Sequence, residues 1–217
     1  MKKKQKSVKR GKKDFVDFAC RQILHVLPEF TDKFQQAYSE NGFYPPVENR
    51  DWTTGFWTGE IWLAYEFCGD ERLKKAGEIQ VHDFLERIDK KISVDHHDMG
   101  FLYSPSCVAA YKLIGSKEGR EAAIRAADQL ITRYHAKGEF IQAWGAMDEP
   151  GNYRLIIDCL PNLPLLYWAS GETGAPDHGA TCQGYRDGSA WARGQAWGDY
   201  FYMEALTRME KDWTLYW

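Results

Sequence analysis

The chain has 217 residues, of which 44% are hydrophobic and 15% aromatic, enough for a sizeable core and too many for a disordered protein. No apolar run is long enough to span a membrane, and no apolar stretch typical of a secretory signal follows the basic N-terminus. Residues 1–13 hold eight of the 28 Lys and Arg side chains, which leaves 20 bases against 31 acids in the rest. We therefore expect residues 1–13 to be a basic disordered tail and residues 14–217 to be one domain, with neither a nucleic-acid nor a membrane partner.

The first predicted element is a helix over about residues 14–36. Apolar side chains three and four residues apart share one face of this segment, as in an amphipathic helix. These side chains are Ala19, Ile23, Val26 and Phe30.

A repeated pattern follows, in which an apolar segment carries a tyrosine four residues before a glycine. The three copies are residues 63–69, 109–115 and 165–171. A glycine at this place is typical of the left-handed residue that ends a helix, so Gly69, Gly115 and Gly171 are predicted helix ends. Asp70 and Ser116 follow the first two glycines and are good N-caps for a second helix.

The segments before and after the first two glycines differ in pattern. Those before are apolar nearly all round, and we expect helices over about residues 58–68 and 104–114. Those after are amphipathic, with apolar side chains at Val81, Phe84, Leu85 and Ile88 and at Ala127, Leu130, Ile131 and Tyr134. This asymmetry predicts αα-hairpins whose first helix is buried and whose second lies outside. The fold class is all-α, and stacked hairpins give an open solenoid or a closed toroid.

The loops that precede the buried helices are rich in Trp, Asp, His and Gly. They include residues 52–57, 96–101, 144–158 and 183–197. If the inner helices run parallel, these loops share one rim and their side chains converge on one cleft. We expect Trp57, Trp62 and Trp168 to be core residues, because they lie inside the apolar helices.

The polar and aromatic residues of these loops suit an acidic sugar. Trp52, Trp144, Trp191 and Trp197 offer flat faces for a sugar ring. Arg193 offers a planar fork for a carboxylate, and Asp98 and Asp158 are candidate acid/base groups. The bland alternatives are that Asp158 only caps a helix and that Arg193 only pairs with a surface acid.

Cysteine and histidine spacing argues against a metal centre. The five cysteines are odd in number and none are spaced as CxxC, so we expect neither disulfides nor a cysteine metal site, and a cytoplasmic location. His96 and His97 precede Asp98, but adjacent histidines rarely bind one ion and no second ligand pair has suitable spacing. We therefore expect no metal.

Four stretches resemble the unsaturated glucuronyl hydrolases of glycoside hydrolase family 88, in family order and over roughly residues 14–203. They are Trp-Thr-Thr-Gly-Phe-Trp-Thr-Gly-Glu (52–60), His-His-Asp-Met-Gly-Phe (96–101), Ile-Ile-Asp-Cys-Leu-Pro-Asn-Leu-Pro-Leu-Leu-Tyr-Trp-Ala (156–169) and Gln-Gly-Tyr with Trp-Ala-Arg-Gly-Gln-Ala-Trp (183–197). The resemblance implies a six-hairpin α/α barrel. It also implies removal of Δ4,5-unsaturated glucuronic acid from the non-reducing end of lyase-generated oligosaccharides, without metal or cofactor.

The same resemblance implies roles for individual residues. Asp158 is the expected acid/base, and Asp98 is the second essential carboxylate, bonded to the substrate. The expected pocket contacts are His97, Gln183 and Arg193, with walls formed by Trp52, Trp144, Trp191 and Trp197.

This sequence departs from the family pattern after its third repeat. Residues 172–182 lack the outer helix and the pocket histidine of the family, and His178 does not align with that histidine. The chain also ends where the family continues, so the predicted domain is a shortened, incomplete barrel. Two alternatives therefore stay open beside the glycosaminoglycan-type hydrolase: a catalytically impaired remnant or uronate-binding scaffold, and a related unsaturated rhamnogalacturonyl hydrolase.

Overall fold

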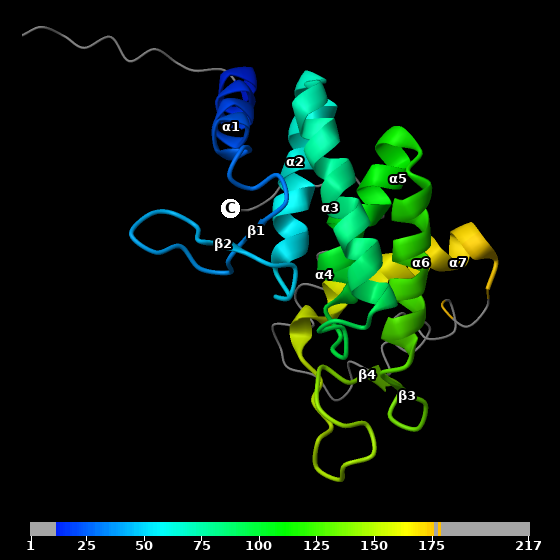
Figure 1. Cartoon of the computed structure of the whole chain (residues 1–217). Coiled ribbons are helices and arrows are strands. Elements are labelled where there is room, and N and C mark those ends of the chain that lie inside the picture. Colours follow the sequence, from blue (N-terminus) through cyan, green and yellow to red (C-terminus); the bar gives the residue numbers. More distant parts are fainter. Residues whose placement is uncertain (1–11, 176–177, 179–217) are drawn as a thin grey trace, which may run out of the picture.

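Helices make up most of the residues that the structure describes, which are 12–175 and 178 of a computed structural model (Figure 1). The α-helices are α1 (Lys12–Val26), α2 (Thr54–Cys68), α3 (Glu71–Asp89), α4 (Met99–Tyr103), α5 (Ala109–Ile114), α6 (Lys117–Ile131) and α7 (Leu163–Thr173). A π-helical turn, η1 (Ser104–Val108), joins α4 to α5, and a 3-10 helix, η2 (Ile157–Asn162), precedes α7. Two short antiparallel pairs join β1 (Phe34–Gln35) to β2 (Pro46–Val47) and β3 (Tyr134–His135) to β4 (Phe140–Ile141). The all-α prediction is confirmed.

The ends of the first two hairpin helices lie where the glycine pattern predicts them. Gly69 and Gly115 both have a φ of 68° and follow α2 and α5 directly. The carboxylate of Asp70 accepts a hydrogen bond from the Arg72 N–H, and the Ser116 hydroxyl accepts one from the Gly119 N–H. Both side chains therefore cap the second helix of their hairpin, as predicted.

The third glycine prediction is wrong. Gly171 lies inside α7, and the left-handed residue that ends this helix is Gly174, with a φ of 69°. Helix continuation is supported by Glu172, whose carboxylate accepts hydrogen bonds from the Tyr111 hydroxyl at 2.8 Å and from the Arg120 guanidinium at 2.7 Å. These contacts fix the extra turn of α7 to the preceding hairpin.

The first predicted helix is too long. Helix α1 ends at Val26, two residues before Pro28, because the residue before a proline is disfavoured in helical conformation. Phe30 is buried, as expected, but it lies beyond the helix, where its ring packs against Trp57 with centroids 5.3 Å apart. Ala19 is exposed, so the buried side of α1 differs from the predicted face.

The described helices other than α1, which packs against α2, form two layers. Helix α2, the continuous helix from α4 through η1 to α5, and helix α7 make one layer. Helix α3 packs against α2 and α6, and α6 packs against α4, η1 and α7, so α3 and α6 make the outer layer (Figure 1). Val81, Phe84, Ile88, Ala127 and Leu130 are buried, as expected for the apolar faces of α3 and α6, and Leu85 and Ile131 are half-buried. Tyr134 was expected on the same face but lies beyond the end of α6, in β3, where it is half-buried.

Helix α2 is buried on one side only, although its sequence is apolar nearly all round. Trp57 and Trp62 are core residues, as expected. Phe56, Leu63 and Phe67 are exposed, although the ring of Phe56 still contacts that of Phe101, with centroids 5.5 Å apart. Trp168 on α7 is half-buried rather than fully buried, with its ring against Tyr111.

The inner helices begin at the same end of the molecule. A Cβ on Gly55, in the first turn of α2, would lie 2.3 Å from the carbonyl oxygen of Phe101 in α4. A Cβ on Gly100, in the first turn of α4, would lie 2.3 Å from the Cα of Asn162, at the end of η2. Glycine is needed at both positions because the backbones are in contact. The three inner helices therefore start side by side, as the shared-rim prediction requires.

Candidate active site

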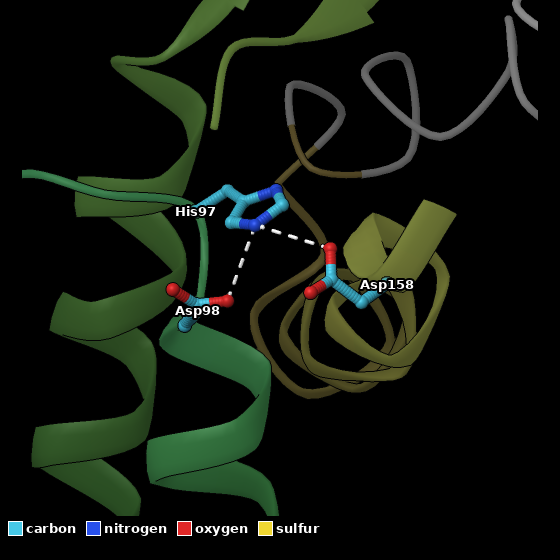
Figure 2. Close-up of side chains that lie close together, drawn as sticks. All are labelled: His97, Asp98 and Asp158. Atoms are coloured by element: carbon cyan, nitrogen blue, oxygen red, sulfur yellow. Dashed lines mark ion pairs between the residues drawn. The ribbon is translucent and has the colours of Figure 1, made fainter. Parts of the chain in front are cut away.

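The candidate acid/base residues lie at the shared end of the inner helices. His97 and Asp98 directly precede α4, and Asp158 is in the first turn of η2. The contact between Gly100 and Asn162 brings these two segments together. Figure 2 shows the imidazole of His97 between the two carboxylates.

Four ionisable groups are in contact here. Nε2 of His97 is 3.2 Å from Oδ1 of Asp98 and 3.4 Å from Oδ1 of Asp158 (Figure 2). Nδ1 of His96 is 3.0 Å from the other oxygen of Asp98, Oδ2. The side chain of His97 is 1% exposed and that of Asp158 is 40% exposed, so the cluster is buried on the histidine side and open to solvent at Asp158.

The environment of His97 and Asp98 favours the charged form of each. Burial alone would lower the pKa of His97, but hydrogen bonds to Asp98 and Cys159 outweigh it and raise the pKa. Burial alone would raise the pKa of Asp98, but hydrogen bonds to His96 and His97 outweigh it and lower the pKa. The two residues therefore form an imidazolium–carboxylate pair.

Asp158 has the opposite tendency. Its burial raises the pKa of the carboxyl group, and the negative charge of Asp98 raises it further, while the charge of His97 lowers it. The net shift is upward, so Asp158 keeps its proton to a higher pH than an ordinary aspartate. Two carboxyl groups whose pKa values are moved apart are the usual arrangement for acid/base chemistry.

Neither aspartate acts as a helix cap. Asp98 occupies the N-cap position of α4 but makes no side-chain capping bond, because its carboxylate is directed at the two histidines. Asp158 lies inside η2, and its Oδ1 is buried without a hydrogen-bond partner among the described residues. The simple capping interpretation of Asp158 is therefore wrong.

Two of the four tryptophans expected at the site lie on segments that contact the segment carrying His97 and Asp98. Trp144 follows Ala143, whose carbonyl oxygen accepts a hydrogen bond from the backbone N–H of His97 at 2.8 Å. Trp52 packs edge-on against Phe101 of α4, with ring centroids 5.8 Å apart. Their exposed fractions are 46% and 42%, so a large part of each ring is open to a ligand.

A buried amide holds the turn that carries Trp144. Gln142 is fully buried, and its Nε2 donates to the carbonyl oxygens of Trp144 at 3.0 Å, Gly145 at 3.1 Å and Ala146 at 3.2 Å. Its Oε1 lies 2.7 Å from Nε2 of His135. Gln142, which directly follows β4, thus holds the backbone turn at Trp144 in place.

The remaining predicted contacts, Gln183, Trp191, Arg193 and Trp197, lie outside the described residues. Sequence reasoning also missed two residues near the site. Arg154 lies over the ring of Trp144, 5.7 Å from its centroid, and Asn162 joins η2 to α4. No motif marks Arg154, whereas Asn162 stands four residues after Asp158, on the same side of a helical segment.

His97, Asp98 and Asp158 also lie close enough to offer three ligand atoms to one cation, since these atoms are within 4.8 Å of one another. The raised pKa of His97 favours a proton on the imidazole between the carboxylates. The expectation of no metal stays a prediction.

The described residues contain no helix both long and apolar enough to cross a bilayer. No family model matches the chain. Among curated proteins, the unsaturated chondroitin disaccharide hydrolase of Streptococcus pneumoniae is 42% identical over 85% of this chain and 56% of its own length. The unsaturated glucuronyl hydrolase of a Bacillus species is 39% identical over 80% of this chain and 56% of its own length. The chain therefore spans about half the length of the curated relatives it matches.

Solved structures give the same picture. The unsaturated glucuronyl hydrolase of Streptococcus agalactiae has a TM-score of 0.78 and 41% identity, over 84% of this chain and 47% of that chain. The Bacillus enzyme has a TM-score of 0.74 and 40% identity, over 77% of this chain and 45% of that chain. Other structures of the S. agalactiae protein are variants with an aspartate changed to asparagine at either of two positions that are 60 residues apart. Asp98 and Asp158 have the same separation.

Proposed function

This chain belongs to the unsaturated glucuronyl hydrolase family, and we propose that it removes Δ4,5-unsaturated glucuronic acid from the non-reducing end of lyase-generated oligosaccharides. The proposal is supported most strongly by one observation: Nε2 of His97 lies between the carboxylates of Asp98 and Asp158, at the end where the inner helices begin. The substrate class in this proposal comes from the names of the relatives, and the acid/base groups come from the structure of this chain.

Asp158 is the acid and base of the proposed reaction. Its raised pKa keeps a proton available, and its partly exposed carboxyl can reach a ligand. It donates the proton to ring carbon 4 of the enol ether, which leaves an oxocarbenium-like centre at carbon 5. Asp158, now a carboxylate, accepts a proton from the water whose oxygen adds to carbon 5, so the group returns to its starting state.

Asp98 and His97 keep the site ready for this step. The negative charge of Asp98 stabilises the developing positive charge and orients the substrate, while His97 bridges the two acids. The hydrated product is a hemiketal at carbon 5. Its collapse opens the sugar ring and breaks the glycosidic link without further catalysis by a metal or cofactor.

The substrate proposed here is a glycosaminoglycan-type disaccharide. Three relatives at 40–42% identity are named unsaturated chondroitin disaccharide hydrolases. Trp52 and Trp144 are proposed as walls for the sugar rings because both are exposed beside the acid/base cluster. Gln183, Trp191, Arg193 and Trp197 stay predicted substrate contacts.

The proposed place of action is the cytoplasm, where such disaccharides would be processed as part of polysaccharide degradation. Cys20, Cys68 and Cys107 are free thiols, which suits a reducing compartment. The expected lack of nucleic-acid and membrane partners stays a prediction.

The test follows the absorbance of the conjugated double bond. The purified chain is mixed with an unsaturated chondroitin disaccharide, and the absorbance is expected to fall. Asp158→Asn should abolish the fall while circular dichroism stays unchanged. Asp89→Asn, an exposed carboxylate at the end of α3, is the matched control and should keep the activity.

Each other outcome points away from the proposal. A folded wild-type chain that binds the disaccharide without bleaching it would be a uronate-binding scaffold. Bleaching of unsaturated rhamnogalacturonan fragments but not of the chondroitin disaccharide would favour the rhamnogalacturonyl alternative.

A further inference from the structure

The amide of Asn162 joins the two segments that carry Asp98 and Asp158. Its side chain is fully buried at the end of η2. Oδ1 accepts hydrogen bonds from the N–H groups of Gly100 at 2.7 Å and of Phe101 at 3.2 Å. Nδ2 donates to the carbonyl oxygen of Asp158 at 3.2 Å. One side chain therefore holds both the start of α4 and the backbone of Asp158.

The bonds to Gly100 and Phe101 replace a cap that α4 lacks. The first N–H groups of a helix have no partner within the helix and need an acceptor from outside. Asp98 is in the N-cap position but uses its carboxylate to bind His96 and His97. Asn162 supplies the missing acceptor, so the carboxylate of Asp98 is left for the imidazole.

The short reach of the amide depends on close backbone contact. A Cβ on Gly100 would lie 2.3 Å from the Cα of Asn162 and 2.7 Å from the carbonyl oxygen of Pro161. No side chain separates α4 from η2 at this point. A change in the Asn162 amide is therefore transmitted directly to the spacing between the two segments.

We propose that Asn162 is a positioning residue that sets the separation of Asp98 and Asp158 across His97. Its side chain is fully buried and acts only through the backbone of Asp158 and the first turn of α4. The inference rests on the proposed function for its kinetic consequences, but the geometry it describes can be tested without turnover.

Two substitutions distinguish the role of the amide oxygen of Asn162 from that of its nitrogen. Asn162→Ala removes both sets of hydrogen bonds. Asn162→Asp keeps an acceptor for Gly100 and Phe101 but puts an oxygen in place of the donor to the Asp158 carbonyl. The matched control is Gln80→Glu, because Gln80 is also fully buried and its Nε2 donates to two backbone carbonyls, those of Phe30 and Lys33, away from the site.

Kinetics on the unsaturated disaccharide give the first result. Misplaced catalytic groups cost turnover rather than binding, so both Asn162 variants should lower kcat roughly 10- to 100-fold with KM within about twofold of wild type. Gln80→Glu should keep kcat within about twofold of wild type, whatever its effect on stability. Wild-type kcat in the folded Asn162 variants would overturn the proposal.

Nitrogen-15 NMR of the His97 ring in the full chain gives the second result and needs no turnover. Because His97 touches Asp158, Asp158→Asn should shift the His97 ring resonances. That shift should be lost when Asn162→Ala or Asn162→Asp is already present, and retained in the Gln80→Glu background. A shift of the same size in all backgrounds would contradict a positioning role.

The two readouts keep the two proposals apart. If the wild-type chain does not bleach the disaccharide, the proposed function fails, and the NMR comparison still decides the role of Asn162. If Asn162→Ala does not fold, Asn162→Asp is the deciding variant. Failure of both to fold would assign Asn162 to the stability of the fold and overturn the positioning role.

Discussion

Nε2 of His97 lies 3.4 Å from Oδ1 of Asp158, a residue 61 positions further along the chain. The histidine precedes α4 and the aspartate is in η2, so the contact depends on how two inner helices start beside each other. Because the charge of His97 acts on the pKa of the Asp158 carboxyl group, changes at His97 test the proposed acid/base role of Asp158.

The first prediction concerns the pH dependence of turnover. The proposed reaction needs protonated Asp158, so kcat should fall as pH rises through the raised pKa of this group. The charge of His97 lowers that pKa, and His97→Gln should therefore move the falling limb to higher pH, besides reducing kcat. His96→Gln, which removes a contact to Asp98 alone, should shift the limb less. A limb that moves to lower pH in His97→Gln would refute this assignment.

The second prediction concerns the pH dependence of stability. Despite its burial, His97 has its pKa raised from 6.5 to about 10 by Asp98 and Cys159, so its stabilising effect is full below pH 6.5 and lost as pH rises toward 10. Despite its burial, Asp98 has its pKa lowered from 3.8 to about 2 by the two histidines, so its effect is lost as pH falls from 3.8 toward 2.

Urea unfolding at a series of pH values tests this. The free energy of unfolding of the wild type, relative to that of His97→Gln, should be greatest between about pH 4 and 6.5 and decline on both sides. Parallel curves for the two proteins would show that the ion pair is absent.

The third prediction concerns the contact between α4 and η2. Gly100→Ala would place a methyl group against the backbone of Asn162 and Pro161, so it should lower the free energy of unfolding by about 1–3 kcal/mol or more. Gly171→Ala is the control, because Gly171 lies inside α7 and a Cβ added to it would have no atom within 4 Å. It should raise the free energy of unfolding by up to about 1 kcal/mol. Equal effects on thermal unfolding would contradict the close approach.

The fourth prediction concerns an aromatic wall. Trp144→Ala should raise KM for the disaccharide roughly 3- to 10-fold, because a stacking surface is lost, with little change in Tm. Phe18→Ala on α1 removes a ring of similar exposure, 48% against 46%, on a helix that does not carry the site. It should leave KM unchanged. Equal KM values for the wild type and Trp144→Ala would remove Trp144 from the binding site.

Local signals predicted the hairpins well where one residue decides the backbone. Gly69 with Asp70, and Gly115 with Ser116, end one helix and begin the next as expected, since a left-handed glycine and an N-cap act within a few residues. The prediction that α7 ends before Gly171 is wrong because tertiary contacts of Glu172 extend the helix by three residues, to Thr173. The predicted length of α1 is wrong because the helical spacing of apolar residues continues past Pro28, whereas the helix itself ends before this proline.

The sequence predicts the residues of the site and their common end of the fold, but not the contacts among them. The motifs contain Trp52, His97, Asp98 and Asp158, and the loop before the third inner helix contains Trp144; all five lie at one end of the described helices. The sequence could not show that His97 lies between both acids, because this depends on the contact between Gly100 and Asn162. Asn162 lies within residues 156–169, but its uncharged amide gives no sign in the sequence of a role at the site.

The central claim is that Asp158 delivers a proton to the sugar double bond rather than to a glycosidic oxygen. Proton NMR of the reaction run in deuterium oxide tests it directly. If Asp158 protonates carbon 4, the vinyl proton signal at this carbon disappears as the disaccharide is cleaved, and deuterium is incorporated there. Release of a monosaccharide that keeps its double bond and its vinyl signal would contradict it.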